Sequence, residues 1–467
     1  MSKYIDLHSI AETVNEINEK NADESTQHVV FNKAYCGQLF LDKSFGNRGN
    51  KYYYKCVPYD KDVPNLIIPY EKKVGFSKKV ENIYVQFKYS DIISKPPKGS
   101  LLQNYGSCVE DVNYYNYLLE ANDLYVSHKK IKDILFKNNE SEYDFERILY
   151  QYDKDYEKIV EKSFVFSIDG ENTRDMDDAL SICDIENGYR VDVFITNVHI
   201  WLDHFELWPF IKDMFSSIYL PHNAHTMLPQ SLTEKFCSLY ENTQRIVVKY
   251  SFFINFQGGI YDFSIKNALV NINENFVYDS QELIENNHYQ KLMDVTNIVG
   301  NSIENSKDLV KFWMERVCGF VGDRYNTGIF VRRQQTLEEI VSHINQPVYL
   351  RSGDYLQVTS PLRKIVDLVN SICVAQPSLL SCVDYLFLDL ERLELMRKRT
   401  KKVENGCKLL DILESCGDIV SRVQQIKDDY YKIVELGKII KLDQPSIVKI
   451  QRFGKNIKIS NNNSIKI

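Results

Sequence analysis

Four aspartates crowd into one short stretch of the chain, and they are the side chains with the clearest chemical potential. They are Asp169, Asp175, Asp177 and Asp178. Carboxylates held close together cannot all ionise cheaply, so the folded protein either takes up protons or binds a cation. Mg²⁺ binds one or two carboxylates directly and completes its shell with water and substrate phosphate. This acidic cluster therefore predicts a magnesium site suited to phosphoryl chemistry.

Other interpretations of the acidic cluster stay open on the residues alone. Most groups of aspartates belong to solvated turns that bind nothing. A calcium loop of the EF-hand type needs acids or amides at odd positions, a central glycine and a terminal glutamate, and DGENTRDMDD does not supply them. Zinc is not expected, because these histidines lack Cys or His partners at ligand spacing: His199, His204, His222 and His225.

The residues on either side of the cluster predict a β-hairpin that holds it. The apolar run from Phe164 to Ile168 predicts a strand that ends at the first aspartate, and ALSICDI predicts a second strand after the acidic turn. Glu186-Asn187-Gly188 is a strong hairpin signal. Along the returning strand the apolar residues alternate with polar ones: Val191, Val193 and Ile195.

Composition and charge exclude several classes of protein. With 467 residues, two or three domains are expected. No apolar run approaches the roughly 20 residues of a membrane span, and the N-terminus resembles neither a secretory signal nor a transit peptide. The ten cysteines show no paired spacing. We expect a soluble, cytoplasmic protein without a membrane partner. Because the net charge is −7, any nucleic-acid site must be local.

Patterns along the chain predict an α+β fold with β-domains at both ends. KYYYKCVPYD and VENIYVQFKYSD suit a small antiparallel barrel, whereas DLVKFWMERVCGFVGDRY and VDYLFLDLERLELMRKRTKKV have the period of amphipathic helices. From Leu436 to Ile467 there are seven Lys or Arg and one acid. The predicted divisions are an N-terminal extension (1–27), an OB-type, cold-shock-like barrel (28–127), a helical connector (128–162), a mixed catalytic domain (163–415) and a short basic OB-like domain (416–467).

Four blocks between about 164 and 370 resemble, in order, the motifs of one enzyme family. They are SIDGENTRDMDDAL, VDVFITNVHIWLD, IYLPHNAHTMLPQSLTEKFCSL and YLQVTSPLRKIVDLVN. The pattern resembles the ribonuclease II and ribonuclease R family, whose catalytic part is the RNB domain. The resemblance implies a hydrolytic 3′→5′ exoribonuclease that degrades single-stranded RNA to 5′-nucleoside monophosphates, with OB-type barrels flanking the catalytic domain.

Carried over position by position, the resemblance makes the whole acidic cluster catalytic. Asp169 and Asp178 become the likeliest direct metal ligands, and Asp177 a further ligand on which the chemical step depends. The implied cofactor is Mg²⁺, for which Mn²⁺ can substitute. Arg363 matches an arginine beside the scissile phosphate, where its planar fork of donors neutralises developing charge. A cation in this turn could instead merely cap a helix.

The resemblance also implies a set of RNA-binding residues. Tyr219 matches a tyrosine that stacks near the terminal nucleotides, although a core tyrosine is the structural alternative. Arg363, Lys364 and Glu404 complete the set. The implied partner is single-stranded RNA, bound by a monomer or within an RNA-degradation complex. Local patches would add positive charge and aromatic rings: Lys72, Lys73, Lys78, Lys79, Arg332, Arg333, Tyr52, Tyr53, Tyr54 and the C-terminal tail.

The chain departs from the family pattern at three places. Asn197 stands where the family has an aspartate, Ser371 replaces a common histidine, and Val317-Cys318 stand for an Ala-Asn pair. These changes leave the acidic cluster intact, but they put the finer contacts to metal and RNA in doubt. Two alternative functions therefore stay open: a catalytically weak or inactive RNA-binding protein of the same fold, and an accessory subunit of an RNA-degradation complex.

Overall fold

The computed structural model describes most of the chain and divides it into two units. The described residues are 33–48, 51–72, 80–138, 143–159, 163–300, 303–333, 336–343, 346–434, 436, 438–442 and 447–461. The sheet unit consists of Val126–Ile218 and His225–Arg397; the barrel unit consists of the residues up to Tyr125, Tyr219–Ala224 and those from Lys398 onward. The predicted extension 1–27 and Lys73, Lys78 and Lys79 lie outside the described residues.

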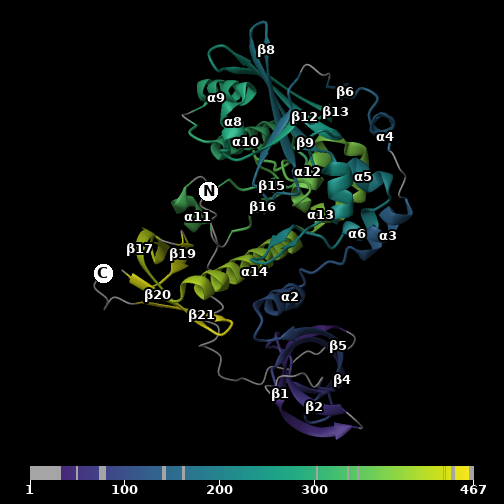
Figure 1. The fold of residues 1–467 in the computed structure, drawn as a ribbon, viewed down its shortest axis with the longest axis vertical. Helices are drawn as coiled ribbons and strands as arrows, with labels where there is room; N and C mark the ends of the chain where they lie inside the picture. Colours follow the sequence, from purple (N-terminus) through teal and green to yellow (C-terminus); the bar gives the residue numbers. More distant parts are fainter. Residues whose placement is uncertain are drawn as a thin grey trace. The chain divides into compact units, whose positions relative to one another are not determined.

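A seven-stranded sheet forms the centre of the sheet unit (Figure 1). Its order is β14-β7-β8-β9-β12-β13-β6. The strands are β6 (Glu157–Lys158), β7 (Phe166–Asp169), β8 (Asp178–Ile185), β9 (Gly188–Thr196), β12 (Gln244–Asn255), β13 (Ile260–Asn271) and β14 (Glu274–Val277). Neighbours are antiparallel except for the β14–β7 and β13–β6 pairs, which are parallel. The predicted hairpin is present as β8 and β9, and β7 ends at the first aspartate.

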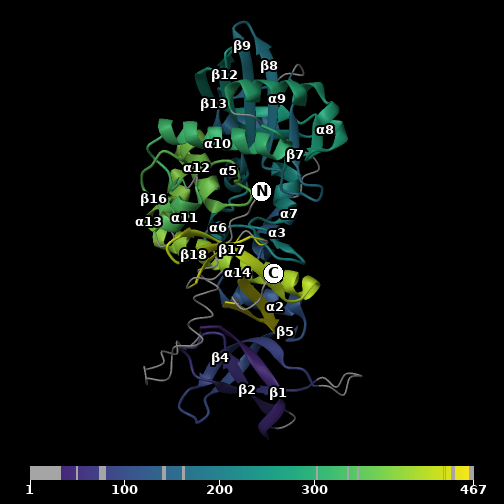
Figure 2. The same ribbon diagram turned by 90° about the vertical axis from the view of Figure 1, so that its left-hand side faces the viewer.

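Helices bury the apolar side chains of this sheet in separate clusters. One cluster joins the sheet to α3 (Lys129–Lys137), α4 (Phe145–Tyr152), α5 (Val198–His204) and α12 (Ile365–Ala375). Another joins it to α8 (Gln281–Glu285), α9 (Asn287–Val299) and α10 (Ser306–Arg324); Figure 2 shows α9 and α10 beside the strands that they cover. Asn286 and Asn305 cap α9 and α10 by accepting backbone N–H bonds.

The remaining elements between Trp208 and Cys416 are short, apart from the long helix α14. They are α6 (Trp208–Ile211), β10 (Ile218–Tyr219), β11 (Ala224–His225), α7 (Gln230–Leu232), the π-helical turn Thr233–Cys237, β15 (Phe330–Val331), α11 (Leu337–Ser342), β16 (Tyr349–Leu350), the 3₁₀ turn Pro377–Cys382, α13 (Asp384–Leu388) and α14 (Leu390–Cys416). In the part of the chain that the structure covers, no helix is both long and apolar enough to cross a membrane.

The barrel unit contains a closed five-stranded barrel with strand order β1-β2-β3-β5-β4. The strands are β1 (Tyr35–Arg48), β2 (Lys51–Pro58), β3 (Leu66–Tyr70), β4 (Ile83–Asp91) and β5 (Lys98–Ser107). A helix, α2 (Asp111–Ala121), follows directly, although the sequence interpretation gave this stretch to the barrel. Its aromatic residues favour strands by propensity. Tertiary packing decides instead, since Tyr117 stacks on Tyr84 of β4 with ring centroids 4.5 Å apart.

The basic C-terminal segment forms a second β-structure in the same unit. Its order is β19-β18-β17-β20-β21, with strands β17 (Ile419–Lys427), β18 (Tyr430–Ile433), β19 (Lys438–Lys441), β20 (Ile447–Phe453) and β21 (Asn456–Asn461). The sheet packs on Leu409 and Leu413 of α14. Arg452 of β20 donates two hydrogen bonds to Asp111 at the start of α2, at 2.9 and 3.0 Å. This ion pair joins the sheet to α2.

The turn between β8 and β9 gives a direct test of how this hairpin is held. Gly188 has φ +145°, and a Cβ there would overlap the carbonyl oxygen of Ile254 on β12. We expect Gly188→Ala to lower the free energy of unfolding by about 2–4 kcal/mol, measured by urea denaturation. Gly406→Ala, in α14 with open space around its Cβ, is the control and should stabilise by up to about 1 kcal/mol. Equal effects would contradict the steric account.

Candidate active site

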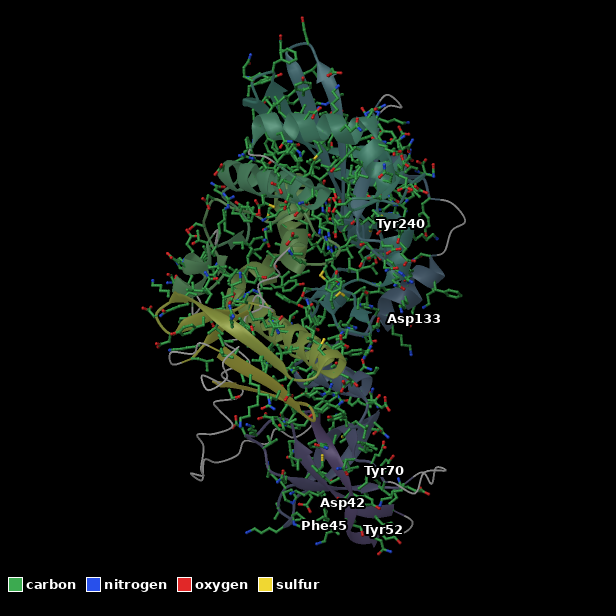
Figure 3. The ribbon with its side chains drawn as sticks, turned by 60° about the vertical axis from the view of Figure 1, so that its left-hand side comes forward. Asp42, Phe45, Tyr52, Tyr70, Asp133 and Tyr240 are labelled. Carbon is green, nitrogen blue, oxygen red and sulfur yellow. The ribbon has the colours of Figure 1, made fainter. Side chains whose placement is uncertain are left out.

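The acidic turn is held between two adjacent strands. Asp169 ends β7 and Asp178 begins β8, two paired strands, and the charge of Asp169 acts on Asp178. These two carboxylates therefore lie near each other. The backbone between them is fixed by neighbouring hydroxyls, because the carbonyl of Arg174 accepts bonds from Ser238 Oγ at 2.6 Å and from Tyr240 Oη at 2.7 Å. Figure 3 labels Tyr240. The end of the turn is therefore tied to Ser238 and Tyr240, whereas Glu171 and Asn172 in its first half are exposed.

Asp177 connects this turn to a second turn far away in the sequence. Its Oδ1 accepts the backbone N–H of Leu362 at 2.8 Å, and its Oδ2 accepts Nε of Arg363 at 2.5 Å. Asp177 is 1% exposed, whereas the Arg363 side chain is 36% exposed. Residues 359–364, which we call the arginine turn, are thus tied to the acidic cluster. Arg363 bonds to a carboxylate of the acidic cluster and, within the described residues, makes no side-chain cap of α12.

Burial makes the negative charge of this cluster costly. It raises the pKa of Asp169 and of Asp177 to about 6, while the positive charge of Arg363 opposes both shifts. The pKa of Asp178 lies well above its ordinary value because of burial first and the charge of Asp169 second. Burial also raises the pKa of Asp175. The electrostatics therefore favour either protonation or a bound cation at neutral pH.

The donor set fits a hard divalent cation. Asp169 Oδ2 and Asp175 Oδ1 are buried, and neither has a hydrogen-bond partner in the described part of the chain. Within the same residues, no three His, Cys, Asp or Glu side chains converge as a metal site. Mg²⁺ needs only one or two direct carboxylates, with water and phosphate oxygens completing its shell. Asp169 and Asp178 are the residues that would hold it.

Tyr278 is a neighbour of the cluster that the sequence reasoning missed. It directly follows β14, which runs parallel to β7, and its N–H bonds to the carbonyl of Asp169 at 3.0 Å. Its pKa is raised by burial and by the charges of Asp178 and Asp169, so its phenol group lies near both carboxylates. Only the β14–β7 pairing reveals this, since Tyr278 is a hundred positions beyond Asp178 and belongs to no motif.

The other predicted site residues fall in two places. Lys364 is exposed and precedes α12 in the sheet unit, next to Arg363. Tyr219 and Glu404 lie in the barrel unit, where Glu404 Oε1 accepts the N–H of Tyr219 at 2.8 Å. The structure thus brings this pair together. Tyr219 is 49% exposed, which excludes the core alternative.

The three departures from the family pattern occupy buried structural positions. Asn197 is fully buried, caps α5 by accepting Ile200 N–H, and donates to Asn267 at 3.0 Å. Ser371 is buried within α12. Val317 and Cys318 pack in the core on α10. Asn197 thus serves as a helix cap, and Ser371, Val317 and Cys318 are buried within helices.

Comparisons with known proteins relate the chain to one domain family and one fold. Residues 154–316 match the RNB domain. A ribonuclease R from Mycoplasmopsis pulmonis is 26% identical over 216 residues, which are 44% of this chain and 30% of that relative. RNase R of Mycoplasma genitalium, solved with ribose-methylated single-stranded RNA, has a TM-score of 0.68 at 14% identity and covers 92% of this chain and 89% of that one. Yeast Ssd1, a pseudonuclease, has a TM-score of 0.56 at 12% identity, with 93% and 68% covered.

The raised pKa values predict how the metal-free protein responds to pH. Between about pH 4 and pH 6 the carboxyl groups of the folded protein bind protons that the unfolded chain has already released. Protonation therefore stabilises the folded state. This stabilisation is complete below about pH 4 and is lost as pH rises through about 6. In EDTA at pH 7.5 we therefore expect Asp169→Asn to unfold roughly 2–4 °C above the unsubstituted protein. The difference in melting temperature between the two proteins should shrink at pH 5. In Mg²⁺ at pH 7.5 it should reverse, so that the unsubstituted protein is the more stable.

The control for this measurement is Glu186→Gln, in the exposed β8–β9 turn. It removes one negative charge from the same sheet without touching the acidic cluster. Its melting temperature should follow that of the unsubstituted protein at both pH values. A stabilisation by Asp169→Asn that is the same at pH 5 and pH 7.5 would contradict the proposed crowding of charge.

Proposed function

Because residues 154–316 are an RNB domain of the ribonuclease II and ribonuclease R family, we propose that this protein hydrolyses single-stranded RNA from the 3′ end and releases 5′-nucleoside monophosphates. The observation that carries the proposal is the acidic cluster tied to Arg363. Arg363 bonds to the buried Asp177 across 186 positions of the chain, and its charge also acts on Asp169, Asp175 and Asp178. Such a site suits a phosphodiester bond that gains negative charge in the transition state.

In the proposed reaction the oxygen of water bonds to the last phosphorus, and the bond between phosphorus and the 3′ oxygen of the preceding nucleotide breaks. The phosphate stays on the 5′ side of the released nucleotide, and the 3′ oxygen of the shortened RNA takes up a proton. When bound at Asp169 and Asp178, Mg²⁺ or Mn²⁺ supplies charge neutralisation for the attacking and leaving oxygens. Arg363 faces the same space and stabilises the equatorial oxygens.

Side chains around the cluster would orient the RNA. The phenol of Tyr278 is placed to donate a hydrogen bond beside the carboxylates. In the barrel unit, the exposed ring of Tyr219 offers a stacking surface for a base, and Glu404 fixes the backbone of that tyrosine. The structure of RNase R from Mycoplasma genitalium in complex with ribose-methylated single-stranded RNA supports this choice of ligand.

The five-stranded barrel would contribute a further RNA-binding surface of the OB type. Phe45 and Tyr52 are half exposed, and Tyr52 pairs with Tyr70 across β2 and β3. Figure 3 shows these three rings on the barrel. Lys72, two positions after Tyr70, lies over the ring of Tyr54. Rings and charges in this arrangement suit single strands, because every base has a face that can stack.

A second candidate is an RNA-binding protein without nuclease activity, acting alone or in an RNA-degradation complex. The fold is shared with Ssd1, which is described as a pseudonuclease, so the fold alone does not separate the two. The acidic cluster favours the enzyme. All four carboxylates are present, and an Arg363–Asp177 bond orders the site.

Digestion of a 5′-labelled single-stranded RNA in Mg²⁺ tests the function. We expect stepwise shortening from the 3′ end that EDTA abolishes and that Asp177→Asn slows by about 10³-fold or more. Glu186→Gln should digest RNA at the unsubstituted rate. RNA that stays intact while binding remains measurable would instead support the non-catalytic candidate.

Substitution of Arg363 tests whether the guanidinium acts on the transition state. Lysine keeps the charge but cannot form the planar fork of donors. We expect Arg363→Lys to lower kcat by about 10–100-fold while RNA affinity in EDTA changes little. Single-turnover kinetics and fluorescence anisotropy would measure the two quantities. A loss confined to affinity would assign Arg363 to binding alone.

Tyr219 offers a test of base stacking. Removal of a stacked ring costs about 1–3 kcal/mol of binding free energy, so Tyr219→Ala should weaken RNA binding in EDTA by about tenfold or more. Tyr261→Ala is the matched control, because Tyr261 is similarly exposed, at 55%, but lies on β13. Equal losses in the two variants would argue against a specific stack.

A further inference from the structure

A buried carboxylate lies behind the arginine turn, outside the acidic cluster. Asp367, in the first turn of α12, is 1% exposed. Its Oδ2 accepts the backbone N–H of Ser360 at 3.0 Å, and its Oδ1 has no hydrogen-bond partner in the described residues. A buried charge is costly unless it is paired and hydrogen-bonded. In the first turn of α12 a carboxylate interacts favourably with the helix dipole, and its bond to Ser360 ties this helix to the arginine turn.

Ser360 is the residue around which the arginine turn is built. Its carbonyl accepts the N–H of Arg363 at 3.1 Å and of Lys364 at 3.0 Å. Its hydroxyl lies 3.4 Å from Nη2 of Arg363. Asp367 therefore holds a residue that contacts both the backbone and the side chain of Arg363.

Charge acts in the same direction as these hydrogen bonds. Burial raises the pKa of Asp367, and the charges of Lys364 and Arg363 are among the effects that oppose the rise. The charge of Asp367 on α12 thus attracts the arginine turn, while Asp177 of the acidic cluster binds Leu362 and Arg363 of the same turn. A turn held on both sides gives the guanidinium little freedom to leave the site.

We propose that Asp367 is a positioning residue, which holds Ser360 and thereby fixes the Arg363 guanidinium at the place where the scissile phosphate reacts. In this proposal Asp367 acts through Ser360 and is not itself a ligand of RNA or metal. The inference rests on the proposed nuclease function for its kinetic consequence, but its structural part, the anchoring of the arginine turn, is independent of that function.

The matched control is Asp192 on β9 of the same sheet unit. It is also 1% exposed, also has one oxygen without a partner in the described part of the chain, and also has one bonded oxygen, which accepts Nε of Arg190 at 3.1 Å. Asp192→Ala should therefore destabilise the domain to a similar degree without loosening the arginine turn.

Amide hydrogen exchange tests the anchoring directly. In Asp367→Ala we expect the amides of Ser360 and Leu362 to exchange about tenfold faster or more, because local opening becomes easier. Asp367→Asn keeps an acceptor oxygen for Ser360 and should remain close to the unsubstituted rate. Asp192→Ala should leave both amides unchanged. Unchanged exchange in Asp367→Ala, or equal acceleration in Asp192→Ala, would overturn the proposal.

A double-mutant cycle with Arg363 tests the kinetic consequence. If Asp367 acts through Arg363, Asp367→Ala should lower kcat by about tenfold in the unsubstituted protein and hardly at all in Arg363→Ala. RNA affinity in EDTA should stay unchanged, and Asp367→Asn should restore most of the rate. Asp192→Ala should have the same small effect in both backgrounds. Additive losses for Asp367 and Arg363 would overturn the kinetic role.

The two experiments separate this inference from the proposed function. An unsubstituted protein that does not digest RNA, combined with accelerated exchange in Asp367→Ala alone, would refute the nuclease and retain the anchoring. If the unsubstituted protein digests RNA but amide exchange in the arginine turn is unchanged by Asp367→Ala, the nuclease is retained and the anchoring is refuted.

Discussion

The ion pair between Arg363 and Asp177 is the interaction on which the candidate site depends. It joins the turn between β7 and β8 to the turn before α12, with the carboxylate fully buried and the guanidinium partly exposed. A buried ion pair contributes little net stability, because desolvation offsets much of the attraction. What this pair provides is geometry. It brings one permanent positive charge against carboxylates that would otherwise repel one another, and Arg363 opposes the pKa rise of each.

The sheet divides the acidic cluster into two kinds of carboxylate. Asp169 ends β7 and Asp178 begins β8, and the charge of Asp169 raises the pKa of Asp178 further. Asp177 has both oxygens bonded by the arginine turn. Groups of the same chemical type thus acquire different environments, and such a difference is how one site assigns different tasks to its acids. The first pair suits a cation, and Asp177 suits the fixing of Arg363.

The parts of the fold with local signals could be predicted from the sequence. The β8–β9 hairpin follows from its turn residues, α10 follows from its helical period, and Arg363 follows from a motif that carries it. Tyr278 and the contact of Asp367 have no such signal, because strand pairing and the packing of a turn on a helix create them. The helix α2 was missed for the same reason, since aromatic residues that favour strands are stabilised there by rings of the barrel.

The energetics of burial bear on whether this fold still performs chemistry. Two carboxylates with buried, unpartnered oxygens, beside two others whose charge burial also disfavours, weaken the metal-free fold at neutral pH. A single Asp-to-Asn change would relieve part of that repulsion while keeping the shape of the turn. RNA binding alone needs positive charge and aromatic rings, neither of which these acids supply. Protonation or a bound cation would relieve this cost, and a bound cation is the state that the proposed nuclease requires.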